Sequence, residues 1–209
     1  MKLYHNPVHT VEELYSLQGT PGKLADNKVI QHIDDLTKQF LAHSPFVVVS
    51  TSNAKGECDS SPRGDTPGFT YVLDNKHLLI PERMGNKRID SMKNILENPN
   101  IGLLFMVPGL EETLRINGEA TIVKDEDLLS KLEAQGHIPK VGIVVHVNEC
   151  FIHCAKAFKR SKLWRPEQWP DTTNLPSPAK IMAAHAKLAG HDEEKVQSSL
   201  NESYNERLY

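Results

Sequence analysis

The sequence has few of the features that mark several large classes of protein. It contains 3 cysteines in 209 residues, too few for a disulfide framework, so we expect reduced thiols and a cytoplasmic location. No apolar run approaches the roughly 18 residues of a membrane span, and the opening MKLYHNPVHT lacks the apolar core of a signal peptide. The net charge of −3 differs from the strong basic excess of a general nucleic-acid binder. We therefore expect partners other than membranes and nucleic acids.

Several chemical motifs are absent as well. There is no Walker sequence, no G-x-G-x-x-G after a strand and no nucleophile elbow, which argues against those nucleotide-binding loops and against a Ser–His–Asp enzyme. His146, Cys150, His153 and Cys154 include residue types that bind metals, but on a strand Cys150 and Cys154 share one face while His153 points to the other. Zinc is the weaker interpretation of this group and buried reduced cysteines the stronger, so we predict no metal site.

Hydrophobic periodicity predicts a mixture of short strands and peripheral helices. A helix is expected from Asp26, its N-cap, through DNKVIQHIDDLTKQFLAHS, and a shorter one over 125–136. Further helices are expected after the proline-rich connector that follows Trp164. Strands are expected over the ranges 45–52, 69–74, 77–82, 100–109 and 142–154, and in TLRINGEATIVKD.

These elements predict a mainly β fold with peripheral helices, of the α+β class. Because the strands follow one another at hairpin spacing and no βαβ alternation is sustained, an antiparallel barrel is favoured over a doubly wound sheet. We divide the chain into an N-terminal arm (1–25), a barrel domain (26–170) and a helical extension of the same domain (171–209).

A basic turn in IPERMGNKRIDSMKNILENP, residues 80–99, is the strongest candidate for a binding site. The expected strand ends at Ile80, and a helix is expected to start at about Lys87, close to Arg83 and Arg88. A helix N-terminus offers unpaired N–H groups and partial positive charge, and Asn86 adds a neutral donor. Several converging donors fit a phosphate monoester better than a carboxylate. A solvated basic helix start is an equally good interpretation on composition alone.

Two other polar clusters lie near the ends of expected strands, SSPRGD where a strand gives way to a loop. SSPRGD (60–65) offers hydroxyls, a guanidinium and a carboxylate. AKAFKRSKLW (155–164) carries several basic residues and ends in Trp164. The second cluster is interpreted either as a cationic surface helix anchored by the tryptophan or as a wall of a pocket for an anionic, aromatic ligand.

The order of these motifs resembles the pyridoxamine 5′-phosphate oxidase-like superfamily, in its broad branch of FMN-binding proteins. The resemblance rests on SSPRGD, LLIPERMGNKRIDSMKNILENPNIGLLFMVPG, ETLRINGEA and FIHCAKAFKRSKLW, and spans roughly residues 26–170. It implies an antiparallel split β-barrel and a homodimer that holds FMN in a cleft between the subunits.

The resemblance also implies which residues bind the cofactor. Lys87 and Arg88 match the basic pair at the FMN phosphate, with neighbours in the same turn, and SSPRGD matches the segment along the flavin. The threonine before LRINGEA matches a position where a polar residue often faces the flavin. The segment ending at Trp164 matches the one that usually closes the site, from the partner chain. The implied set is Ser61, Arg63, Arg83, Asn86, Lys87, Arg88, Thr113, Arg160, Ser161 and Trp164.

One departure limits what the resemblance implies about activity. The oxidases proper end in an arginine–histidine signature that grips pyridoxal phosphate, whereas this barrel ends in RSKLWRPEQW, which argues against turnover of a B6 vitamer. The leading hypothesis is an FMN-dependent oxidoreductase acting on an unidentified small molecule, with NAD(P)H as a candidate electron donor. The alternative is a flavin- or haem-binding sensor or carrier without turnover. The sequence does not identify a catalytic acid or base.

Overall fold

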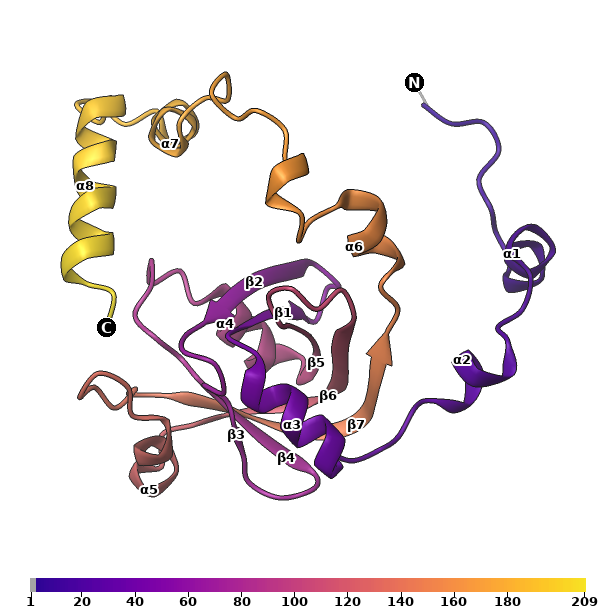
Figure 1. The fold of residues 1–209 in the computed structure, drawn as a ribbon. Coiled ribbons are helices and arrows are strands. Elements are labelled where there is room, and N and C mark those ends of the chain that lie inside the picture. The colour runs from indigo at the N-terminus through magenta and orange to yellow at the C-terminus, as the bar shows by residue number, and fades with distance from the viewer. Residues whose placement is uncertain (1–2) are drawn as a thin grey trace.

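Seven antiparallel strands in a single sheet form the centre of the molecule. The computed structural model describes residues 3–209. The strand order is β2-β1-β5-β6-β7-β4-β3, with β2 and β3 at the two edges, so the sheet curves without closing (Figure 1). The predicted split-barrel, mainly β fold is therefore confirmed. The strands are β1 (Phe46–Ser52), β2 (Cys58–Gly64), β3 (Tyr71–Val72), β4 (His77–Pro81), β5 (Asn100–Met106), β6 (Thr113–Val123) and β7 (Gly142–His153).

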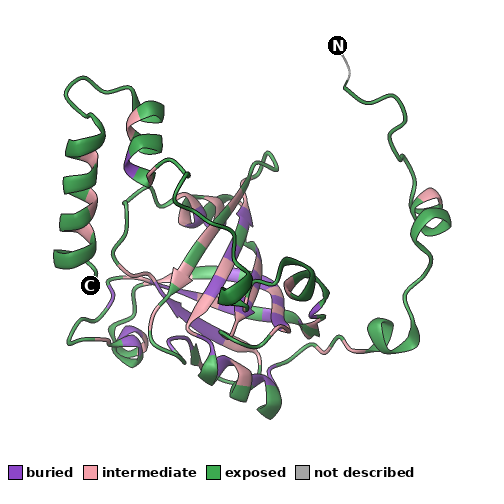
Figure 2. Ribbon diagram, turned by 45° about the horizontal axis from the view of Figure 1, so that its top comes forward, coloured by how far each residue is buried: buried purple, intermediate pink, exposed green. Residues whose placement is uncertain are grey.

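The core lies inside the curve of the sheet, where alternate residues of each strand point inward. Val47 and Val49 of β1 and Leu103 and Phe105 of β5 are almost completely buried. Their neighbours in the sequence face outward, as the two-residue period of a strand requires. The burial colours of Figure 2 follow this alternation along the strands. Strand β4 is buried on both faces, because Leu79 packs outside the barrel against Leu129 and other apolar residues.

The helices lie around the sheet. Helix α3 covers one side of the core, α4 follows β4, and α6 follows β7 (Figure 1). Their bounds are α1 (Val11–Gln18), α2 (Lys23–Asn27), α3 (Asp35–His43), α4 (Asp90–Glu97), α5 (Glu126–Leu129), α6 (Lys156–Ser161), α7 (Pro178–Ala186) and α8 (Glu193–Glu206), with short 3₁₀ turns at Ser130–Leu132 and Pro166–Gln168.

The prediction of a single helix that starts at Asp26 is wrong. The backbone of Ile30 exchanges two hydrogen bonds with Cys150 of β7, at 3.0 and 2.7 Å, which holds this part of the chain extended. The helix begins only after Asp34, whose carboxylate accepts a bond of 2.7 Å from the Thr37 N–H. Pairing with the sheet therefore overrides the local helical pattern.

Three further expectations need correction. The helix expected at about Lys87 begins at Asp90. The strand expected over 69–74 is reduced to the two residues of β3. Cys150 is buried as expected, but Cys154 is exposed, because β7 ends at His153 and leaves the barrel.

Both ends of the chain extend beyond the barrel. Helices α1 and α2 project away from the sheet, and α1 has no buried residue (Figures 1 and 2). Helices α7 and α8 pack mainly against each other, and the chain then returns to the barrel at Tyr209. Within residues 3–209, no helix combines the length and the hydropathy needed to cross a membrane.

Candidate functional site

A cavity of about 890 Å³ lies between strand β2, the segment after β4 and the start of helix α4. Six of the ten residues predicted to bind the cofactor line it, and they come from two segments that are separate in the sequence. These residues are Ser61, Arg63, Arg83, Asn86, Lys87 and Arg88. The volume falls in the range of about 300–1,000 Å³ typical of small-molecule pockets.

The turn before α4 has an unusual backbone. Lys87 and Ile89 both adopt left-handed conformations, with φ values of 60° and 52°. For a β-branched residue such as isoleucine this conformation is rare and strained, and strained backbone tends to persist at functional sites. Ile89 is also the N-cap of α4 and provides no side-chain hydrogen bond to the helix. The first N–H groups of α4 are therefore left for another acceptor.

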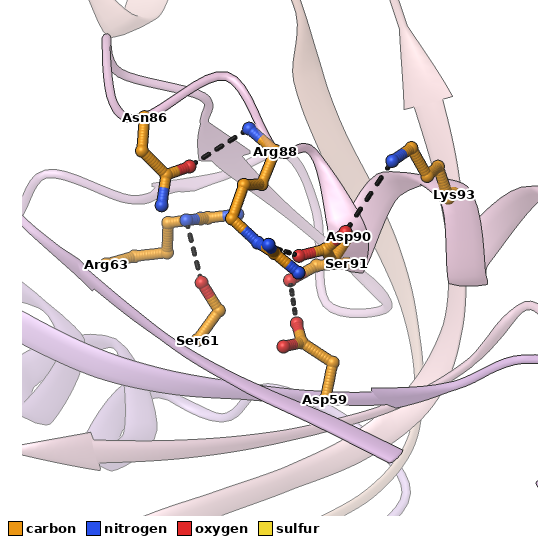
Figure 3. Close-up of polar contacts among 8 residues, drawn as sticks. All are labelled: Asp59, Ser61, Arg63, Asn86, Arg88, Asp90, Ser91 and Lys93. Atoms are coloured by element: carbon orange, nitrogen blue, oxygen red, sulfur yellow. Dashed lines mark hydrogen bonds and ion pairs between the residues drawn. The ribbon is translucent and has the colours of Figure 1, made fainter. Parts of the chain in front are cut away.

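Two basic side chains stand at this uncapped helix start. Arg88 donates from Nε to Asp90 at 2.7 Å, and its backbone N–H donates to Asn86 Oδ1 at 3.0 Å (Figure 3). The Arg88 side chain is 73% exposed, so its terminal nitrogens remain accessible. Within residues 3–209, Lys87 has no acidic partner within ion-pair distance. The arrangement can bind an anion by charge and by backbone donors together.

Ser91 anchors the helix beneath this site. It is 1% exposed, and its hydroxyl donates a hydrogen bond of 2.6 Å to Asp59 of β2 (Figure 3). The bond ties α4 to the edge strand that forms the opposite wall of the cavity. The hydroxyl is therefore a positioning group in this arrangement.

The wall of the cavity that β2 forms carries a partly buried ion pair. Arg63 Nη2 lies 3.1 Å from Glu82 Oε2, and its Nη1 donates to Ser61 Oγ at 2.9 Å. Among residues 3–209, neither Arg63 Nε nor Glu82 Oε2 has a hydrogen-bond partner, although both atoms are buried. Burial raises the pKa of Glu82, and the Arg63 guanidinium opposes this rise. An unpaired buried N–H costs about 1–3 kcal/mol, which a ligand acceptor would offset.

Arg83 forms an ion pair with Asp65. Its Nε donates to Asp65 Oδ2 at 2.7 Å, and the hydroxyl of Tyr209 donates to Asp65 Oδ1 at 2.8 Å. Burial acts to raise the pKa of Asp65. Hydrogen bonds from the Thr66 N–H and the Tyr209 hydroxyl, together with the charge of Arg83, outweigh burial and leave the pKa below its ordinary value. This ionised carboxylate fixes Arg83 and brings Tyr209 to the rim of the cavity.

Four of the predicted residues do not line the cavity. Thr113 is 3% exposed and pairs with His153 at the start of β6. Arg160 and Ser161 are exposed on α6. Trp164 donates from its indole N–H to the Leu110 carbonyl at 2.8 Å and stacks on the Phe158 ring at 5.5 Å. Within one chain, this contact makes Trp164 an anchor for the segment after α6.

The predicted set of cofactor-binding residues does not include Asp65, Glu82 or Tyr209. Asp65 and Glu82 balance Arg63 and Arg83, and each adjoins an arginine or lies two residues from one. Acidic and basic residues so close together in the sequence could have indicated that Arg63 and Arg83 form ion pairs. The sequence does not indicate that Tyr209 reaches the cavity. Tyr209 lies more than a hundred residues from Asp65, its hydrogen-bond partner, and no local pattern connects the two.

Comparison with known proteins gives the family. A model described as pyridoxamine 5′-phosphate oxidase matches residues 33–154, which is more than half of the chain. The protein belongs to the pyridoxamine 5′-phosphate oxidase family. None of the curated proteins matches the chain.

Solved structures similar to this chain include one protein named for FMN binding and one named for haem storage. HupZ from Group A Streptococcus is 25% identical, with 57% of this chain and 93% of that chain covered and a TM-score of 0.46. An FMN-binding protein from Syntrophomonas wolfei is 10% identical, with coverages of 55% and 81% and a TM-score of 0.43. HutZ, a haem storage protein from Vibrio cholerae, is 12% identical, with coverages of 58% and 93% and a TM-score of 0.43.

Proposed function

We propose that the chain binds FMN in the cavity beside α4 and acts as an FMN-dependent oxidoreductase on a small molecule. The observation that carries this proposal is the pairing of two accessible basic side chains, Lys87 and Arg88, with the uncapped start of α4 at one end of the cavity. A phosphate monoester is the anion that uses such a set of donors most fully.

The residues present fit the phosphate end of FMN. Lys87 and Arg88 supply full charges, and the N–H groups at the start of α4 supply donors from another direction. Asp90 accepts a hydrogen bond from one nitrogen of Arg88, which orients the guanidinium without occupying all of its donors. The positive end of the helix dipole adds to the same attraction.

The residues on the other wall fit a polar ring edge. Arg63 has a buried Nε without a hydrogen-bond partner, and a carbonyl or ring nitrogen of a ligand would satisfy it. Glu82 holds the guanidinium in place, and Ser61 accepts from its other side. FMN would supply the hydride and electron chemistry in this cavity. Arg63 would then stabilise negative charge that develops on the pyrimidine end of a reduced ring.

We further propose a C2 homodimer that completes the cleft. On one chain, Arg160, Ser161 and Trp164 lie away from the cavity, although the resemblance assigns them to the cofactor. A two-fold arrangement could bring α6 of one subunit to the cavity of the other, because a C2 interface presents the same patches twice. FMN would then lie at the subunit interface.

A complementation experiment tests this shared site. A Lys87→Ala/Arg88→Ala chain and an Arg160→Ala/Trp164→Ala chain should each bind FMN weakly alone. When equal amounts are unfolded together and refolded, random pairing makes about half of the dimers mixed, and one of the two sites in each mixed dimer is intact. About a quarter of all sites should therefore recover wild-type affinity. Fluorescence titration that finds no high-affinity sites in the mixture would refute the shared cleft.

Non-catalytic binding of flavin or haem remains the second candidate. Among the described residues that line the cavity, His137 is the single histidine, and an imidazole is a suitable axial ligand for haem iron. His137 bonds from Nδ1 to the Gln135 carbonyl at 2.9 Å, so its Nε2 is the nitrogen that could bind iron.

The visible spectrum separates these functions. We expect the purified protein to show flavin bands that bleach when NADH or NADPH is added without oxygen, because hydride transfer reduces the flavin. Flavin bands that stay unchanged with both donors would favour a binding protein. A Soret band that disappears in a His137→Ala variant would establish the haem alternative and defeat the proposed function.

A further inference from the structure

Two histidines meet on the outer face of the sheet, away from the cavity. His77 of β4 and His146 of β7 are direct partners in the antiparallel ladder, so their side chains lie on the same face. His146 Nδ1 lies 3.1 Å from His77 Nε2, and the ring centroids are 5.0 Å apart. Both rings are accessible, with His77 38% exposed and His146 exposed.

A carboxylate fixes the orientation of the first ring. Both oxygens of Asp74 lie 2.9 Å from His77 Nδ1, so this nitrogen donates to the carboxylate and Nε2 is the nitrogen that faces His146. The N–H of Lys76, in the same turn, holds Asp74 by a bond of 2.7 Å. A carboxylate behind a histidine is the usual second partner of a metal-binding imidazole, because it orients the ring and raises its basicity.

The distance between the two nitrogens suits one metal ion. Metal–nitrogen bonds are about 2.0–2.1 Å long. Two nitrogens bound to the same ion therefore lie about 2.9 Å apart when the N–metal–N angle is about 90°, and about 3.3 Å apart when that angle is tetrahedral. The observed 3.1 Å lies between these values. In the metal-free chain, one proton between the two nitrogens fills this gap. A neutral imidazole can carry that proton on Nε2 instead, which frees Nδ1 as a second ligand.

The surrounding charges favour a cation. Glu119 of β6 lies opposite His146 in the ladder and is exposed on the same face. The ammonium of Lys76 is directed to the Gln31 carbonyl. No group of three or more His, Cys, Asp or Glu side chains within residues 3–209 is arranged to hold a metal ion, so the remaining coordination positions would be filled by water.

We propose that His77 and His146, supported by Asp74, form a surface site for a divalent transition metal that prefers imidazole, such as Ni²⁺, Cu²⁺ or Zn²⁺. The ion would join strands β4 and β7 across their pairing. This site is separate from the proposed FMN site and does not depend on it.

Calorimetric titration of the 209-residue chain with NiCl₂ tests the site. The protein should carry no affinity tag, and Cys58→Ser and Cys154→Ser should be in the background, because both thiols are exposed. We expect one Ni²⁺ per chain, displaced by EDTA. His77→Ala and His146→Ala should each weaken this binding by more than tenfold. Asp74→Asn should weaken it by about 10- to 100-fold, as loss of a supporting carboxylate does.

The matched control is His43→Ala, an exposed histidine whose ring nitrogen contacts the Gln39 carbonyl. It should bind Ni²⁺ like the background protein. Circular dichroism before each titration identifies any variant that does not fold, and Asp74→Asn tests the site with both rings retained. Unchanged affinity in His146→Ala and Asp74→Asn, or loss of binding in His43→Ala, would overturn the proposal.

Discussion

Replacing Lys87 and Arg88 together with alanine should weaken FMN binding by about two to four powers of ten. Each charge-assisted hydrogen bond to a phosphate contributes roughly 1.5–3 kcal/mol, and about 1.4 kcal/mol corresponds to a tenfold change in affinity. The exposed pair contributes little to folding, so the barrel should remain intact. Alanine can adopt the left-handed backbone of Lys87 as readily as lysine does. Fluorescence titration of the apoprotein measures the change.

Riboflavin and a neighbouring lysine provide the controls. Riboflavin lacks the phosphate, so it should bind the wild type weakly, and the double variant should hardly distinguish it from FMN. Lys93→Ala removes a positive charge from the same helix, but Lys93 does not line the cavity, and FMN affinity should stay within about threefold of wild type. A folded double variant that still prefers FMN as strongly as the wild type does would place the phosphate elsewhere.

Gly118→Ala should be severely destabilising. A Cβ atom at this position would lie 1.9 Å from the backbone oxygen of His146, at the irregularity between Asn117 and Gly118 in the β6–β7 ladder. No flexible side chain can move to relieve this clash, so the two central strands must separate locally. Overpacking typically costs about 1–3 kcal/mol and occasionally more, and we expect a loss of at least about 3 kcal/mol or failure to fold. Urea unfolding measures the loss.

Gly102 is a matched control in the adjacent strand. A Cβ atom there would meet Asn117 Oδ1 at 3.5 Å and Ser50 Cβ at 3.8 Å, which are ordinary contacts. Because glycine within a strand is less favourable than alanine by about 0.5–1 kcal/mol, Gly102→Ala should be neutral or slightly stabilising. If Gly118→Ala unfolded at the same urea concentration as the wild type, the described pairing of β6 with β7 would be contradicted.

The strands could be predicted from local pattern, whereas some boundaries could not. The β-branched run of β1 and the alternation of β6 identify strands because one face of each is buried. The region around Ile30 has equally clear helical spacing, yet it pairs with Cys150 of β7. That pairing joins residues far apart in the sequence, and no local pattern contains it.

The basic half of the candidate site was predictable, but its acidic half was not. Lys87 and Arg88 stand out because they adjoin a helix start and a glycine turn. The ion pairs of Arg63 with Glu82 and of Arg83 with Asp65 depend on the approach of β2 to the end of β4, which follows only from the folded sheet. The left-handed conformation of Ile89 was equally hidden, because its residue type argues against it.

A crystal structure of the protein grown with FMN tests the central claim most directly. We expect the phosphate within hydrogen-bond distance of Lys87, Arg88 and the first N–H groups of α4, with the ring system in the cavity against Arg63. FMN density outside this cavity, or a phosphate without contact to the start of α4, would contradict the account.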